Sequence, residues 1–189
     1  MPDGLKRLHR SGQSHFLTFS CYHRQPLLTR MHMQEPFLLA LEKMRRRFQM
    51  QIYGYVVMPE HVHLLLGEPE GNMLAKAVQV LKTNVSRQAG KQGERTVDAP
   101  FWQTRYFDLN VRNNAGFFTQ LRYIHRNPVK RGLCDRPEDW PWSSFRAWGL
   151  GEVGLVEVDS DLIVQRREMC LRGISPAEST KCTPLSGRQ

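Results

Sequence analysis

The chain has 189 residues and a formal net charge of +9, so its length fits one domain with an extension, or two small domains. Residues 1–150 carry 22 basic and 12 acidic side chains, whereas residues 151–189 carry 5 and 6. A positive excess within a compact domain favours a polyanionic partner, most often nucleic acid, and a generally basic surface is the alternative.

The cysteines and the apolar segments exclude several protein classes. The four cysteines lie far apart and form no Cys-x-x-Cys pair, which argues against both a zinc knuckle and a disulfide framework. No stretch approaches the roughly 18 apolar residues of a membrane span, and the N-terminus lacks the apolar core of a signal peptide. We therefore expect a cytoplasmic protein with reduced thiols and no membrane contact.

The hydrophobic spacing predicts a regular order of strands and helices. In chain order we expect a strand over 15–22, a helix over 35–48, strands over 51–58 and 61–67, a helix over 72–89, a loop over 90–100, a strand-like segment over 101–112 and a helix over 114–127. The last helix is expected to end before Pro128, because the residue preceding a proline disfavours helical geometry.

This order predicts the α+β class, as a ferredoxin-like split βαβ sandwich in which helices cover one antiparallel sheet. We assign residues 1–150 to this domain and residues 151–189 to a C-terminal extension. The last dozen residues are rich in Ser, Thr, Pro and Gly, which is typical of disordered segments.

Two histidines in the expected strand over 61–67 are candidate metal ligands. His61 and His63 lie on one face because strand side chains alternate, and the apolar side chains between and after them point into a core. Two neutral imidazoles on a rigid strand suit a divalent metal. We expect both rings to lie on the open face of the strand, and the alternative to a metal site is a pair of ordinary polar strand positions.

A tyrosine in the expected helix over 114–127 is a candidate nucleophile. The apolar stripe of this helix consists of Phe117, Leu121 and Ile124. Tyr123 lies roughly 140° from the centre of that stripe at about 100° per residue, on a face shared with Gln120 and Asn127. Its hydroxyl is therefore presented rather than packed. Such a tyrosine can attack a phosphate beside a metal ion, or can simply cover the surface.

These motifs resemble a known family. The run MPEHVH resembles the HUH motif (His, hydrophobic residue, His) of the single-strand DNA tyrosine transposases. The runs RYIHRNPVKRGL and DWPWSSF are similar to the signature of the REP-associated tyrosine transposases, and FWQTRYFD matches the aromatic segment between those blocks. The resemblance extends from about His15 to Phe145.

The resemblance implies roles for individual residues. His61 and His63 correspond to metal ligands, and Tyr123 corresponds to the nucleophile. The third ligand is expected one turn beyond the tyrosine on the same helix, where Asn127 stands, with Glu60 and His125 as rivals. An amide carbonyl is a competent ligand for a hard ion, and the implied cofactor is Mg²⁺ or Mn²⁺.

The resemblance also implies a substrate, a single-stranded DNA hairpin that is cut through a 5′-phosphotyrosine and rejoined. Basic side chains expected along the phosphates are Arg24, Arg105, Arg112, Arg122, Arg126, Lys130 and Arg131, and aromatic side chains expected to stack on bases are Tyr22, Trp102, Tyr106 and Phe107. The protein is expected to act as a monomer or a homodimer. The alternatives are a hairpin-binding protein without catalysis and a nickase like the rolling-circle replication initiators.

Overall fold

The computed structural model describes residues 14–30, 32–91 and 100–159. The C-terminal residues expected to be disordered, and most of the loop expected over 90–100, lie outside this part. Within it, no helix is both long enough and apolar enough to cross a membrane.

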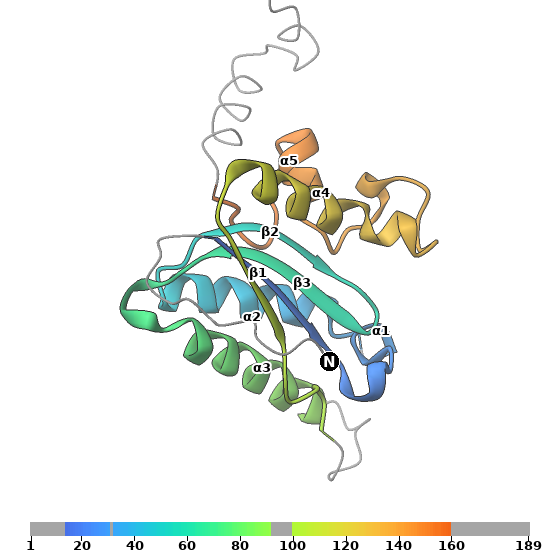
Figure 1. Cartoon of the computed structure of the whole chain (residues 1–189). Helices are drawn as coiled ribbons and strands as arrows, with labels where there is room; N and C mark the ends of the chain where they lie inside the picture. Colours follow the sequence, from blue (N-terminus) through green and yellow to red (C-terminus); the bar gives the residue numbers. More distant parts are fainter. Residues whose placement is uncertain (1–13, 31, 92–99, 160–189) are drawn as a thin grey trace, which may run out of the picture.

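The described residues form one antiparallel sheet with helices on both faces (Figure 1). The strands are β1 (Ser14–Ser20), β2 (Ile52–Val57), β3 (His61–Gly67) and β4 (Phe107–Val111). The long helices are α2 (Gln34–Arg47), α3 (Leu74–Lys91) and α4 (Asn114–Lys130), and the short ones are η1 (Tyr22–Arg24), α1 (Leu27–Arg30), η2 (Glu70–Asn72), η3 (Pro137–Asp139) and α5 (Phe145–Leu150). The strand order is β2-β3-β1-β4. The predicted ferredoxin-like split βαβ arrangement is confirmed.

The alternation of side chains along β1 and β3 divides the core into two layers. Leu17, Phe19 and the even-numbered residues of β3 face α2 and α3, in the larger of the two hydrophobic clusters. Phe16 and Leu65 face α4, in a smaller cluster with Leu121 and Ile124 of that helix. Because helices cover both faces, every residue of β3 is buried.

Helix α4 can pack close to β2 because the strand residue that faces the helix is a glycine, which has no Cβ atom. A Cβ atom added at Gly54 would lie only 2.6 Å from Leu121 Cδ1. The block Trp140–Ser144 then follows β2, since Val57 N donates to Trp142 O at 2.8 Å and Trp140 Nε1 donates to Val57 O at 3.1 Å. These two tryptophans therefore have packing roles, Trp142 against the larger hydrophobic cluster and Trp140 against the smaller one.

The expected end of α4 before Pro128 is wrong, because the helix continues to Lys130. Proline lacks one backbone donor, so near a helix end it costs a single hydrogen bond. The true end is set by Gly132, whose φ of +65° closes the helix in the left-handed region. Leu133 N donates to Pro128 O and Gly132 N donates to Val129 O, each at 3.0 Å.

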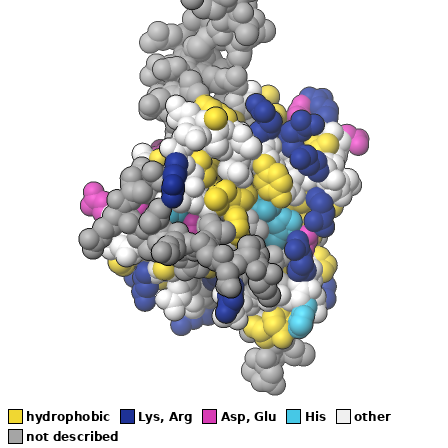
Figure 2. All heavy atoms as spheres, in the orientation of Figure 1, with side chains coloured by type: hydrophobic (Ala, Val, Ile, Leu, Met, Phe, Trp, Pro, Cys, Tyr) yellow, Lys and Arg dark blue, Asp and Glu magenta, His cyan; other side chains and the backbone are white. Residues whose placement is uncertain are grey.

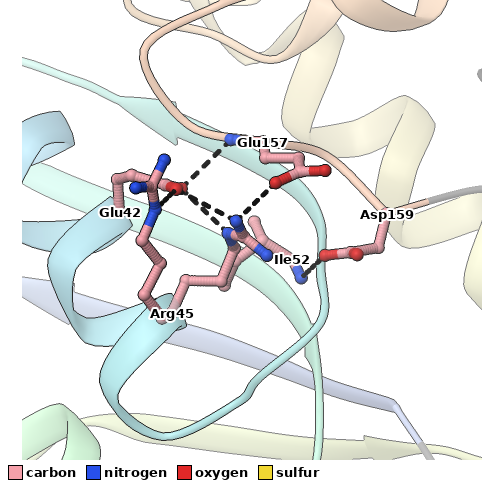
Figure 3. Close-up of polar contacts among 6 residues, drawn as sticks. Glu42, Arg45, Ile52, Glu157 and Asp159 are labelled. Atoms are coloured by element: carbon pink, nitrogen blue, oxygen red, sulfur yellow. Dashed lines mark hydrogen bonds and ion pairs between the residues drawn. The ribbon is translucent and has the colours of Figure 1, made fainter.

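The described start of the C-terminal extension packs against the sheet and α2 (Figure 3). Val156 and Val158 are buried in the larger cluster. Glu157 N donates to Glu42 Oε2 at 3.1 Å, and Ile52 N donates to Asp159 Oδ2 at 3.0 Å. Residues 152–159 therefore form a strap across the domain, while the division at residue 150 stays a prediction.

Glu42 holds this strap, and its carboxylate also accepts hydrogen bonds from Arg45 Nε at 2.9 Å and Arg46 Nε at 2.6 Å. Burial alone would raise the pKa of Glu42, but these hydrogen bonds and the Glu157 amide outweigh it, so the pKa is lowered. We expect Glu42→Gln to lower the free energy of unfolding by about 1.5–3 kcal/mol at neutral pH.

Because the folded pKa of Glu42 lies below the unfolded value of about 4.3, this stabilisation is present above that value and is lost as the pH falls through the folded pKa. Urea unfolding from pH 7 to pH 3 measures the difference. Glu70→Gln, at an exposed carboxylate, is the control and should change little. A Glu42→Gln penalty that persists unchanged at pH 3 would contradict the assignment.

Candidate functional site

A cavity of about 570 Å³ lies between the sheet and α4. It is lined by Phe16, Thr18, Ser20, Arg24, His61, His63, Phe107, Leu109, Gln120, Tyr123, Asn127, Lys130 and Arg131. It thus collects both histidines, the tyrosine and the asparagine that the sequence singles out. Figure 2 shows histidine side chains on this face next to hydrophobic ones, with Lys and Arg side chains along one border.

The two histidines converge through the same ring nitrogen. In the pairing of β1 with β3, His61 lies opposite Ser20 and His63 opposite Thr18. His61 Nε2 and His63 Nε2 lie 3.0 Å apart. The expectation of an open sheet face is wrong, because α4 covers the pair and only 3% of His61 and 4% of His63 are exposed.

The opposite ring nitrogens have separate partners. His63 Nδ1 lies 2.7 Å from Thr18 Oγ1, and the His63 ring stacks on Phe16 with centroids 5.4 Å apart. His61 Nδ1 lies 3.1 Å from Glu60 Oε1, within ion-pair distance although the angle is outside hydrogen-bond geometry. Partners at Nδ1 are the usual means by which a protein fixes the tautomer that leaves Nε2 free for a metal.

Burial keeps both imidazoles neutral at neutral pH. Desolvation lowers the pKa of His63 to about 3, with smaller contributions from His61 and Arg24. Desolvation also lowers the pKa of His61, although the nearby Glu60 carboxylate opposes the shift. A neutral imidazole keeps the lone pair that a metal ligand needs.

Of the three candidates for a further ligand, only Asn127 reaches the Nε2 side of the pair. Its Nδ2 lies 3.2 Å from His63 Nε2, and its buried Oδ1 has no hydrogen-bond partner among the described residues. Glu60 contacts the far nitrogen of His61 instead. His125 pairs with Ser144 Oγ at 2.9 Å, on another side of α4.

The described residues contain no group of three or more His, Cys, Asp or Glu side chains suited to a metal. Beside the two histidines, the side chain that could add a third ligand from α4 is the amide of Asn127. The converging nitrogens of His61 and His63 fit a divalent metal. Asn127 now presents Nδ2 to His63, and a turn of its amide group would bring the unpartnered Oδ1, a ligand for hard divalent ions, to the same place.

Tyr123 borders this group from α4. Its side chain is exposed, as the helix geometry predicts, yet its ring contacts His63 and Phe16 edge to face, with centroids 5.1 Å and 5.9 Å apart. Lys130 Nζ lies 5.7 Å from the centre of the tyrosine ring. The phenol is thus presented to solvent beside the histidine pair and next to a positive charge.

The predicted basic residues fall into separate groups. Arg24, Lys130 and Arg131 line the cavity with the histidines. Arg105 lines a neighbouring cavity of about 650 Å³ that shares Thr18, Ser20 and Phe107 with it. Arg122 and Arg126 line a third cavity, of about 540 Å³, between α4 and α5. Arg112 lies just beyond β4, outside these three cavities.

Sequence reasoning missed the two residues of β1 that contact the His63 ring, Phe16 and Thr18. Strand alternation places Phe16 and Thr18 on the other face of β1 from Leu17 and Phe19. Their position beside the histidines could have been predicted from the sequence once β1 is known to pair with β3. Among the aromatic residues expected to stack on bases, Trp102 is buried in the core, whereas Phe107 is exposed at the edge of the cavity.

Comparison with known proteins places this geometry in a family. The family model of IS200-like transposases matches residues 10–127, which include both histidines, Tyr123 and Asn127. A REP-associated tyrosine transposase of Escherichia coli is 29% identical over 142 residues, which cover 74% of this chain and 81% of that protein. A Haemophilus influenzae protein named for the same group is 29% identical over 117 residues, or 58% of this chain and 66% of its own length.

A solved structure is also similar, that of a REP-associated tyrosine transposase bound to a REP hairpin. It superposes with a TM-score of 0.65 at 26% identity and covers 85% of this chain and 93% of that one. The resemblance to this group extends from sequence motifs to the whole fold. The chain belongs to the IS200-like transposase family, and within it the chain resembles the REP-associated tyrosine transposases.

Proposed function

We propose that this protein is a metal-dependent transposase that nicks single-stranded DNA hairpins with Tyr123 and rejoins the strands. The observation that carries the proposal is the approach of His61 Nε2 to His63 Nε2 at 3.0 Å, directly beside an exposed tyrosine ring. The tyrosine and the histidines come from different elements, so their meeting is a property of the fold.

The proposed metal is Mg²⁺ or Mn²⁺, held by His61, His63 and Asn127. When bound, such an ion polarises a non-bridging oxygen of the scissile phosphate and offsets the charge that develops there. The protein supplies neutral imidazoles and an amide oxygen, and Thr18 and Glu60 hold the two rings from their far sides.

The proposed chemistry of Tyr123 is an in-line displacement at phosphorus. The exposed phenol gives its proton to solvent water, its oxygen forms a bond to phosphorus, and the bond from phosphorus to the 3′ oxygen breaks. The leaving oxygen takes up a proton and becomes a free 3′-hydroxyl, while the other strand end stays attached as a 5′-phosphotyrosine. This ester conserves the broken bond, so a 3′-hydroxyl can reverse the step without a nucleotide cofactor.

The proposed substrate follows from the structural relative that is bound to a REP hairpin. Arg24, Lys130 and Arg131 supply positive charge at the cavity, and Phe107 supplies an exposed ring at its edge. Charge for the backbone and an aromatic ring for an unpaired base are what single-stranded DNA requires.

Incubation with 3′-labelled hairpin oligonucleotides in Mn²⁺ tests this function. We expect a covalent protein–DNA adduct that carries the label, together with an unlabelled product that ends in a 3′-hydroxyl. Palindromes from the genome that encodes the protein provide the substrates. Tight hairpin binding with no adduct and no cut strand, across these palindromes and with either ion, would favour the alternative of a hairpin-binding protein without catalysis.

The arginines between α4 and α5 lead to a prediction about the hairpin stem. Arg122 and Arg126 are exposed next to Phe118 and Trp148, and within the described residues neither forms an ion pair. We expect the hairpin stem to cross this side of α4. The double variant Arg122→Gln with Arg126→Gln then loses two phosphate contacts. Each contact with a duplex contributes about 0.9 to the slope of log affinity against log salt concentration, so the slope should become shallower by nearly 2.

The matched control removes two charges from the opposite face of the sheet. Lys43 and Arg47 have the same i, i+4 spacing on α2 and are also exposed. Lys43→Gln with Arg47→Gln should leave the slope unchanged. Equal slopes for the two double variants, measured by anisotropy on one labelled hairpin, would show that net charge rather than the α4 surface sets the effect.

A further inference from the structure

Glu60 lies directly before β3, and one of its carboxylate oxygens contacts two groups of the site. Glu60 Oε1 lies 3.1 Å from His61 Nδ1 and 3.0 Å from Arg131 Nη2. The glutamate is buried, with 8% of its surface exposed, whereas about half of the Arg131 side chain is exposed and lines the cavity beside Tyr123. A buried carboxylate therefore stands between a histidine of the pair and a solvent-facing guanidinium.

Glu60 is placed to act on His61 when a metal binds the Nε2 atoms of the two histidines. A neutral imidazole carries one proton, so a metal on Nε2 requires that proton to be on Nδ1. At His63 the acceptor for this proton is Thr18 Oγ1. At His61 no described group hydrogen-bonds to Nδ1, and Glu60 Oε1 is the carboxylate oxygen within reach.

We propose that Glu60 is a positioning residue, which holds His61 in the metal-binding tautomer and couples that ring to Arg131. The inference rests on the proposed function, because it assigns Glu60 a role toward the same metal. The same oxygen, Glu60 Oε1, contacts both His61 and Arg131. When a DNA phosphate binds the Arg131 guanidinium and moves it away, the negative charge of Glu60 is no longer offset and acts on His61 alone. Negative charge at Nδ1 strengthens Nε2 as a ligand, so metal and DNA phosphate favour each other's binding.

Mn²⁺ binding to the metal-free full-length chain, without DNA, tests the positioning role. The electron paramagnetic resonance signal of free Mn²⁺ gives the dissociation constant directly. Glu60→Gln keeps the size of the side chain and removes its charge, and we expect affinity to fall about 10-fold or more. Glu60→Asp should recover part of the loss. Glu70→Gln, the same change at an exposed carboxylate beyond the other end of β3, should bind as wild type.

A double-mutant cycle tests the coupling to Arg131. In the wild-type background, Arg131→Gln removes the competing cation and should tighten Mn²⁺ binding several-fold. In the Glu60→Gln background the same change should have a clearly smaller effect, because the carboxylate that transmits it is gone. An equal effect in both backgrounds would overturn the coupling.

The outcomes separate this inference from the function on which it rests. If the wild type binds Mn²⁺ and Glu60→Gln binds it equally well, the positioning role is wrong while the metal site stands. If thermal melting shows that Glu60→Gln is unfolded, the comparison of Glu60→Asp with wild type decides in its place, and equal affinities overturn the role. If the wild type binds no Mn²⁺, the proposed metal site is wrong and this inference is wrong with it.

Discussion

Replacing Tyr123 with phenylalanine is expected to abolish the covalent adduct while hairpin affinity stays within a few-fold of wild type. The change removes only the oxygen proposed to attack phosphorus, and the ring keeps its edge-to-face contacts with His63 and Phe16. Loss of a nucleophile should slow cleavage by about 10³-fold or more. Single-turnover nicking of a labelled hairpin in Mn²⁺, with binding measured separately, provides both quantities.

The control for this variant is Tyr53→Phe, because Tyr53 lies on β2 outside the cavity and donates its hydroxyl hydrogen bond to Gln51, the residue before that strand. It should nick at the wild-type rate. Adduct formation by the Tyr123→Phe variant at the wild-type rate would place the nucleophile on another residue. A joint loss of cleavage and hairpin binding would show that the phenol serves in recognition.

Replacing His61 or His63 with alanine is expected to remove both metal binding and metal-dependent cleavage. Because both rings are buried, each change also leaves a cavity, and we expect a loss of about 1–3 kcal/mol in the free energy of unfolding. The loss should be larger at His63, whose ring packs against Phe16 and Tyr123. Asn127→Ala should act more mildly and raise the Mn²⁺ concentration needed for half-maximal cleavage.

Calorimetric Mn²⁺ titration and thermal melting distinguish the two effects. His32→Asn is the control, since His32 is exposed at a positive φ that asparagine tolerates, and it should bind Mn²⁺ as wild type. Cleavage by His61→Ala or His63→Ala at the wild-type Mn²⁺ requirement would exclude the pair as ligands. An unchanged requirement in Asn127→Ala would point to water or another group as the third ligand.

Periodicity in the sequence predicted the strands, the long helices and the placement of the two histidines and the tyrosine, whereas the roles proposed for these residues came from the family resemblance. Alternation along residues 61–67 places His61 and His63 together, and helical spacing separates Tyr123 from its apolar stripe. The burial of the histidines could not be predicted in this way. It depends on α4 crossing the second face of the sheet, and Gly54, which permits that approach, has no periodic signal.

The details at the helix ends and in the electrostatics depended on tertiary contacts. The rule for residues before proline placed the end of α4 too early, although Gly132 marked the true end in the sequence. The spread of basic residues over three cavities is not visible in composition, because even Arg126 and Lys130, one turn apart on α4, line different cavities. Glu60 was a rival candidate for the third ligand, yet its carboxylate lies at His61 Nδ1, on the far side of that ring from His63.

Strand β3 lies between two hydrophobic clusters, and this position determines which parts of the protein can unfold locally. Its amides lie in the centre of the sheet, bonded to β1 and β2, so their hydrogen exchange should require global unfolding. Helix α4 is anchored mainly by Leu121 and Ile124 in the smaller cluster, so its amides should exchange through a cheaper, partial opening. The histidines and Tyr123 then belong to separate cooperative units, and the tyrosine can swing away from the histidine pair while that pair stays assembled.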